Sequence, residues 1–223
     1  MPEMRWSGSH PVEPDAGNWG MIRLPDPRDY QVPPPPENDS LQTRAELTEL
    51  RKLTGRRSST DVEEILYWSV REPSAPTHWE RTADQLIRQY GLSVPAGARI
   101  QFMLTAAIHC ALVACWHEKY HYLRPRPPQL DQAIDVSVIP LPDHPSYPSG
   151  HSTAAGAAYR LLRSFFPNER ERLKAMAEQA GLSRLKAGIH YRSDHEAGLD
   201  LGSAVARQLV EEADRDGAPP WYE

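Results

Sequence analysis

The stretch from Pro95 to Leu123, "PAGARIQFMLTAAIHCALVACWHEKYHYL", decides the fold. Small and apolar residues lie around most of the circumference of the helix that it predicts, so this helix should be central and buried. A proline near the start suits the first turn of a helix, where the N–H groups have no intrahelical partner. The stretch therefore predicts a bundle built around one long helix.

Further helical patterns cover residues 40–53, 60–70, 77–92, 151–165 and 167–191. Thr60 and Thr77 are predicted N-caps, because a hydroxyl beside the first turn accepts a hydrogen bond from a free N–H group. Gly91 is the predicted end of its helix. Ser193 and Glu196 have the spacing of a capping box that opens a last helix. Since "DVSVIP" is the single short strand candidate, the predicted fold class is all-α, a single helical bundle.

Proline marks the domain organisation, and many of the 22 prolines fall in two segments. Residues 1–38 are too rich in proline to be helical and are predicted to form an extended arm packed on the body. Residues 39–215 are predicted to form the all-α domain, and residues 216–223 a short tail. The second proline-rich segment, residues 124–148, is a long loop, and long loops inside compact domains usually carry function.

Composition limits the classes of partner. The chain of 223 residues is 39% hydrophobic and has a formal net charge of −5, which argues against non-specific binding of nucleic acid. An anion site must therefore be a local cluster of cations. The absence of a long unbroken apolar run and of an N-terminal apolar segment leads us to expect a cytoplasmic protein without a membrane span, with export of a trimmed precursor as the alternative. The arm and the small-residue helices would permit a homodimer.

The stretch "SYPSGHSTAAGAAYRLL" places Ser149, Gly150 and His151 at the mouth of a predicted helix. The first N–H groups of a helix lie at the positive end of its dipole, so a hydroxyl and an unobstructed amide there can cradle an oxyanion such as phosphate. His151 could transfer a proton to or from the bound group. The alternative is an ordinary N-cap followed by a glycine turn.

Two further stretches carry charge. In "KYHYLRPRP", Lys119 and Arg126 are seven residues apart, although a lysine that complements the helix dipole and arginines that solvate a loop, Arg124 among them, would look the same. In "SRLKAGIHYRSDHEAG", Arg184 and His190 could converge if their helix ends near Gly188. Asp194 could then hold His190 in one tautomer. A structural histidine is the alternative.

Taken in order, these three stretches resemble the three-part signature of the superfamily of type 2 phosphatidic acid phosphatases and vanadium-dependent haloperoxidases. The matching patterns are Lys119-x6-Arg126-Pro127, then Pro148-Ser149-Gly150-His151, then Ser183-Arg184-x5-His190-x3-Asp194. The resemblance spans roughly residues 95–210, with no departure at a defining position. It implies that the three segments meet around one oxyanion.

The resemblance implies a role for each residue. The oxyanion would be bound by Lys119, Arg126, Ser149, Gly150 and Arg184. His190 would attack phosphorus or serve as the single protein ligand of vanadate, with Asp194 supporting it and His151 acting as general acid and base. Vanadate is thus the implied cofactor, and phosphate would use the same contacts.

The same set of residues around the oxyanion could serve two reactions. A haloperoxidase would oxidise halide with hydrogen peroxide, with Lys119 activating the bound peroxide, whereas a phosphatase would hydrolyse a small phosphoester through a phosphohistidine. Trp116 and His144 favour the haloperoxidase, because the resemblance places an aromatic residue and a residue that tunes halide choice there. Both could also be plain core and loop residues, and the chain is short for that branch. A non-catalytic phosphate-binding helical module is the third alternative.

Overall fold

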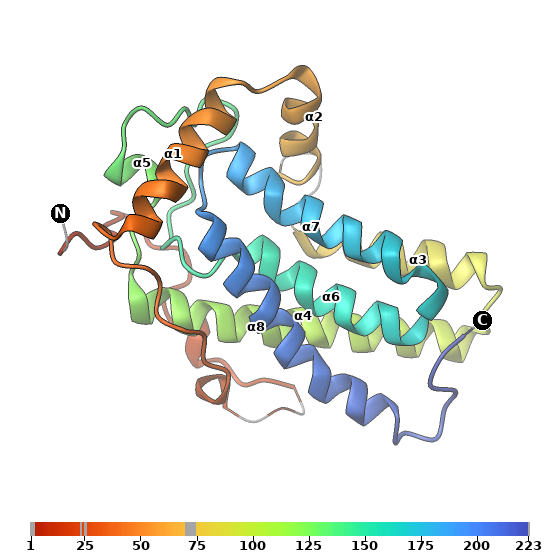
Figure 1. Ribbon diagram of the computed structural model, residues 1–223. Helices are drawn as coiled ribbons and strands as arrows, with labels where there is room; N and C mark the ends of the chain where they lie inside the picture. The colour runs from red at the N-terminus through yellow and green to blue at the C-terminus, as the bar shows by residue number, and fades with distance from the viewer. Residues whose placement is uncertain (1–2, 23, 25, 70–74, 223) are drawn as a thin grey trace.

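The computed structural model describes residues 3–22, 24, 26–69 and 75–222 and contains helices joined by loops (Figure 1). The α-helices are α1 (Leu41–Gly55), α2 (Ser59–Tyr67), α3 (Ala75–Gln89), α4 (Val94–Tyr122), α5 (Pro127–Leu130), α6 (Gly150–Phe165), α7 (Arg170–Lys186) and α8 (Arg192–Ala213). Three 3-10 turns are η1 (Ala16–Asn18), η2 (Pro27–Asp29) and η3 (Pro167–Glu169). No strand occurs within these described ranges, so the prediction of an all-α fold is confirmed.

Helix α4 is the long core helix that the sequence predicted. It begins after Ser93, whose hydroxyl accepts a hydrogen bond from the Ala96 amide, and it ends where Leu123 adopts a left-handed conformation with φ of 51°. Helix α6 lies against α4, α7 and α8 (Figure 1). A Cβ atom at Gly156 would lie 2.2 Å from the Leu199 carbonyl oxygen, and one at Gly202 would lie 2.0 Å from that of Thr153. Glycine at these positions therefore allows α6 and α8 to approach closely, which brings their N-terminal ends together.

Two predicted helix starts are wrong. Helix α2 begins one residue before Thr60, because the Ser58 hydroxyl accepts from the Asp61 amide while the Asp61 carboxylate accepts from the Ser58 amide. Helix α3 already includes Thr77, so Thr77 is not its N-cap. The predicted end at Gly91 agrees with its φ of +59°, a left-handed conformation that suits glycine. The predicted end of the second helix, Val70, lies outside the described residues.

The segment predicted as one helix over 167–191 is divided. A 3-10 turn precedes α7, and α7 ends at Lys186 ahead of Gly188, whose φ is +78°. The predicted capping box of Ser193 and Glu196 is wrong, because α8 has already begun after Tyr191. The Asp194 carboxylate accepts from the Tyr191 amide at 3.1 Å instead. This turn between α7 and α8 is what presents His190 to the interior.

Residues of the proline-rich N-terminal segment contact α4. The Trp6 amide donates to the Leu123 carbonyl at 2.7 Å, and the Val12 carbonyl accepts from the Tyr120 hydroxyl at 2.7 Å. Tyr30 is buried as well. In Figure 1 this segment passes beside α4 and returns toward α1. The division into an arm (1–38), a helical domain (39–215) and a tail (216–223) stays a prediction.

Candidate active site

Two of the three stretches line one cavity of about 370 Å³, and Arg126 of the third contacts His190 in the cavity wall. Its polar wall includes His144, Gly150, His151, Arg184 and His190. The remaining wall is mainly apolar and includes Leu112, Trp116, Ile139, Pro140, Pro142 and Ile189. Helices α3, α4, α6 and α7, the segment after α2, the loop before α6 and the turn before α8 thus supply the lining, from segments that are far apart in the sequence.

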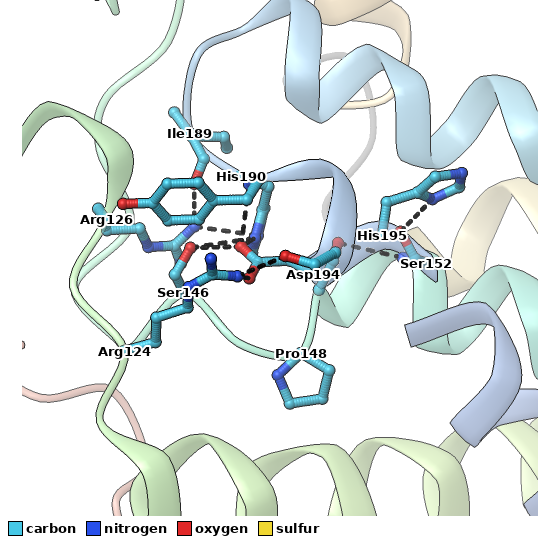
Figure 2. A network of polar contacts seen from close by, with 12 residues as sticks. Arg124, Arg126, Ser146, Pro148, Ser152, Ile189, His190, Asp194 and His195 are labelled. Carbon is cyan, nitrogen blue, oxygen red and sulfur yellow. Dashed lines mark hydrogen bonds and ion pairs between the residues drawn. The ribbon is translucent and has the colours of Figure 1, made fainter. Parts of the chain in front are cut away.

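His190 is held from both ring nitrogens (Figure 2). Its Nδ1 lies 2.9 Å from Asp194 Oδ2, and its Nε2 lies 2.9 Å from Arg126 Nη1. Because a carboxylate accepts and a guanidinium donates, this pairing assigns the proton to Nδ1 and leaves a lone pair on Nε2. Burial, reinforced by the Arg126 charge, holds the pKa of His190 well below its ordinary value. The imidazole is therefore neutral, with Nε2 able to act as a nucleophile or a metal ligand.

Asp194 is the centre of a buried polar network. Its carboxylate lies 2.7 Å from Arg124 Nη1 and accepts a hydrogen bond from the Ser146 hydroxyl at 2.5 Å. Burial raises the pKa of this carboxyl, but the Arg124 charge and the contact with His190 outweigh burial and hold the pKa below its usual range. Asp194 is thus an anion at neutral pH, which fixes the tautomer of His190.

Lys119 lies beneath the cavity rather than in its lining. Its fully buried ammonium donates to the carbonyl oxygens of Pro145 at 2.8 Å, Ser146 at 3.0 Å and Pro148 at 2.6 Å. Burial lowers the pKa of Lys119 to about 7. In this arrangement all three N–H donors of the Lys119 ammonium bind the loop before α6. The positive charge of Lys119 therefore acts on the cavity through its electrostatic field.

Arg126 and Arg184 are also buried and bonded to neutral acceptors. Arg126 donates to the carbonyl oxygens of Ile189 at 2.7 Å and His144 at 3.1 Å. Arg184 donates to the carbonyl oxygen of Ile65 at 2.8 Å and to the Ser69 hydroxyl. The pKa of each guanidinium is lowered by burial.

The charges of Lys119, Arg126 and Arg184 are not balanced by an ion pair with any of the residues that the structure describes. Burying a charge without an opposite charge is costly. A bound anion would remove that cost, so the arrangement is suited to an oxyanion with two or three negative charges.

Ser149 and His151 lie at the N-terminus of α6. The Ser149 hydroxyl accepts from the Ser152 amide at 3.4 Å, which makes Ser149 the N-cap, and its own amide donates to the Asp194 carbonyl at 2.9 Å. His151 lines the cavity, and its Nε2 lies 3.0 Å from the Trp68 carbonyl oxygen. Burial, with the Arg184 charge, lowers the pKa of His151 to about 3. His151 is therefore neutral in the free protein.

Trp116 and His144 form a pair at the cavity wall. Their ring centroids are 5.0 Å apart, and His144 Nδ1 lies 3.1 Å from Arg126 Nη2. The Trp116 indole N–H donates to the Val12 carbonyl at 3.2 Å. A Cβ atom at Gly150 would lie 3.3 Å from the Trp116 ring, so the indole covers the glycine. Both side chains border the cavity, and Trp116 also packs against the hydrophobic core.

Sequence reasoning missed two members of the site. Arg124, considered only as a residue that solvates a loop, is buried between Asp194 and Glu46. Ser146 is buried and bonded to Asp194. The repeated arginine in "RPRP" was the available signal for Arg124, whereas its partner Glu46 lies far away in the sequence.

Comparison with known proteins shows the family. The family model described as PAP2 superfamily matches residues 98–212, just over half of the chain, so the protein belongs to the PAP2 superfamily. The lipid A 1-phosphatase of Rhizobium johnstonii is 37% identical over 83 residues, covering 36% of this chain and 34% of that one. The vanadium-dependent bromoperoxidase of Corallina pilulifera is 32% identical over 98 residues, covering 32% of this chain and 16% of that one.

A solved structure extends the similarity to most of the chain. The structure described as the first bacterial vanadium-dependent iodoperoxidase has a TM-score of 0.82 and 25% identity, and covers 93% of this chain and 60% of that one. These relatives are enzymes, either phosphatases or vanadium-dependent haloperoxidases, so the chain is a member of an enzyme superfamily. The match spans about a third of the length of the phosphatase relative.

The expectation of a cytoplasmic protein without a membrane span is wrong. By length and composition, the segment Val94–Leu130 could cross a membrane, although 61% of its most apolar window is buried inside the protein. A transmembrane PAP2 type phosphatidylglycerolphosphate phosphatase from Bacillus subtilis shares the fold, with a TM-score of 0.51 and 17% identity over 80% of this chain and 90% of that one. A buried core helix and a membrane span have similar compositions, so counting unbroken apolar residues did not separate them.

Proposed function

We propose that the protein is a vanadate-dependent haloperoxidase, which oxidises halide with hydrogen peroxide. The observation that carries this choice is the similarity to the iodoperoxidase, which extends over 93% of the chain with a TM-score of 0.82. The Trp116–His144 pair beside the cavity supports it, because it lies where halide and peroxide would meet the oxyanion.

The donor set fits vanadate. His190 Nε2, with its lone pair, would be the protein ligand, and the charges of Lys119, Arg126 and Arg184 would balance the anion. Ser149 and Gly150 would add the positive end of α6. When bound, vanadate supplies a Lewis-acid centre that activates hydrogen peroxide toward halide.

Proton transfer would fall to His151. Its neutral imidazole can accept a proton in the free protein, and an anion bound beside it would raise its pKa and allow it to donate. Arg126 must turn from His190 Nε2 toward the anion when the anion binds, because both use the same ring nitrogen.

A phosphatase is the second candidate, and the 37% identity to lipid A 1-phosphatase favours it. His190 Nε2 would then attack phosphorus, and His151 would protonate the leaving alcohol. A small phosphoester would replace peroxide and halide as the substrate. The non-catalytic module has less support, since the relatives of both kinds are enzymes. The homodimer stays a prediction.

One purified sample separates the two activities. It is assayed with p-nitrophenyl phosphate without vanadate, and then with vanadate, hydrogen peroxide and iodide or bromide. We expect vanadate to create halide oxidation and to suppress any phosphatase activity. Strong phosphatase activity without halide oxidation would overturn the haloperoxidase proposal and favour the second candidate.

The His151→Ala variant tests the proton-transfer role. We expect it to retain vanadate binding while its turnover falls by about two to four orders of magnitude, the usual contribution of general acid–base catalysis. The measurements are a vanadate titration and the turnover rate on the same sample. Unchanged turnover would show that His151 has no role in proton transfer and is only a residue beside the helix N-cap.

A further inference from the structure

A second buried histidine, His195, has a partner on each ring nitrogen. Its Nδ1 lies 2.9 Å from the Ser152 hydroxyl, and its Nε2 lies 3.1 Å from Glu178 Oε2. His195 and Ser152 are buried, whereas the Glu178 side chain is 46% exposed. Because a carboxylate only accepts, Nε2 donates to Glu178, and in the neutral ring Nδ1 accepts from Ser152. One imidazole thus links α6, α7 and α8.

This link lies directly behind the candidate site. His195 follows Asp194 on α8, and Ser152 follows His151 on α6 (Figure 2). The main chains of the two helices meet at the same place, where the Ser149 amide donates to the Asp194 carbonyl at 2.9 Å. The link therefore lies where the N-terminal end of α6 meets the N-terminal end of α8, next to His190.

The surroundings exclude a separate hydrolytic site. Serine, histidine and glutamate together have the composition of a catalytic triad, but a Cβ atom at Gly198 would lie 2.8 Å from Ser152 Cβ. A Cβ atom at Gly181 would lie 1.9 Å from His195 Nδ1 and 2.7 Å from the Ser152 hydroxyl. The backbones of α7 and α8 thus close tightly around both side chains, and no room remains for a substrate at Ser152.

We propose that His195 is a positioning residue, which holds the Ser149–Gly150–His151 end of α6 in register with the His190–Asp194 pair. This inference rests on the proposed site, in which an anion must be met from both helices at once. Groups that orient direct ligands typically change affinity or activity by about 10–100-fold when removed. A shift of α6 relative to α8 would separate the anion-binding end of α6 from His190 without removing any group that touches the anion.

The test uses substitutions at His195 in the full chain, with orthovanadate as the probe. His195→Leu fills the space but removes both hydrogen bonds, whereas His195→Asn keeps an acceptor near the position of Nδ1. We expect His195→Leu to weaken vanadate binding and lower kcat by about tenfold or more, with KM for peroxide changed by less than about threefold. His195→Asn should recover both values to within about threefold of wild type.

A matched pair on α6 provides the control. Ser152→Ala removes the hydroxyl that bonds His195, and Ser164→Ala removes a hydroxyl that bonds only the Leu161 carbonyl of its own helix, at 2.7 Å. Ser152→Ala should behave like His195→Leu, and Ser164→Ala like wild type. Circular dichroism and thermal melting confirm that each variant is folded.

The outcomes separate the two proposals. Folded His195→Leu that binds vanadate as wild type does, or His195→Asn that is as impaired as His195→Leu, would overturn the positioning role. Wild-type protein that binds vanadate without oxidising halide would overturn the haloperoxidase proposal alone, because the vanadate titration still tests His195. Wild-type protein that binds no vanadate would overturn both.

Discussion

Two walls of the same cavity differ in how they are held. The inner wall consists of Arg184 and His190, which line the cavity, and of Lys119 and Arg126, which lie behind the lining. All four side chains are buried and hydrogen-bonded on nearly every donor and acceptor. The outer rim, which consists of Trp116, Ile139, Pro142 and His144, is largely apolar, and its indole is anchored by one bond to the Val12 carbonyl. The difference indicates that the inner wall fixes the anion chemistry, while the outer rim can vary with the substrate.

The inner wall also differs from Arg124, which supports it from behind, in how the positive charges are balanced. Arg124 lies between the carboxylates of Asp194 and Glu46, so its charge is compensated inside the protein. Within the described part of the chain, the cations of the inner wall bond to neutral acceptors. We therefore expect the pairing of Arg124 to be independent of anion concentration, and the charges of the inner wall to be balanced when an anion binds.

The largest effect is expected at His190. His190→Ala removes the nitrogen that would bind vanadium or attack phosphorus, so vanadate retention and turnover should both fall to background. A vanadate titration and the halide-oxidation assay on the folded variant measure this. Activity comparable to wild type would remove His190 from the reaction.

Arg124→Met should have the next largest effect, and mainly on stability. It leaves the buried Asp194 carboxylate without its cation, and breaking a buried pair in this way costs about 3–5 kcal/mol. Urea unfolding measures the change in the free energy of unfolding. Arg88→Met is the control, because Arg88 pairs with Asp84 at 2.7 Å at the surface, where a pair contributes about 0–1 kcal/mol. Equal losses in both variants would contradict the contrast between a buried pair and a surface pair.

Local patterns in the sequence were sufficient to predict the helices, but they did not reveal which residues bond to the charged side chains. Small residues along α4 and α6 predicted buried helices. The segment 167–191 was predicted as one helix, and the break near Gly188 that presents His190 entered only as a condition. The start of α2 was missed because Ser58 and Thr60 are both capping residues, and the reciprocal hydrogen bonds between Ser58 and Asp61 select Ser58.

Long-range pairing explains the other omissions. Arg124 meets Glu46 and Asp194 across 78 and 70 positions, and His195 meets Ser152 across 43, so no local spacing reveals either contact. The family signature brought the three stretches together, but it does not state which donors face the cavity. The finding that Lys119 bonds three carbonyl oxygens of the loop before α6 required the structure.

The pH dependence of anion binding sharpens the role of the inner wall. Burial lowers the pKa of Lys119 from 10.5 to about 7. Between pH 7 and pH 10.5 the unfolded chain therefore carries a proton that the folded protein lacks. Raising the pH in this range increases the free energy of unfolding of the anion-free protein. We expect anion binding to require the ammonium form of Lys119. Affinity for sulfate, whose own charge is constant in this range, should therefore fall above pH 7 by up to about tenfold per pH unit.

Lys119→Met is the comparison for this profile. Calorimetric titration with sulfate between pH 6 and pH 9 should give weaker but nearly constant affinity in this variant. An equally steep decline in the variant and in wild type would assign the titration to another group.

The smallest effect is expected at the outer rim. His144→Phe removes the contact between His144 and Arg126 and keeps an aromatic ring against Trp116. A hydrogen bond contributes about 1 kcal/mol, or about fivefold, so turnover should change by that order and differently for bromide and iodide. Rates with the two halides measure this. A loss as large as that of His190→Ala would place His144 in the inner wall.

A crystal soaked in vanadate, with the vanadium located by its anomalous scattering, tests the central claim most directly. We expect one strong vanadium peak beside Nε2 of His190, with the Arg126 guanidinium turned from that nitrogen toward the anion. A vanadium peak elsewhere, or a cavity that stays without vanadium while Arg126 keeps its contact with His190, would contradict the claim that this cluster of buried cations is built to bind an oxyanion.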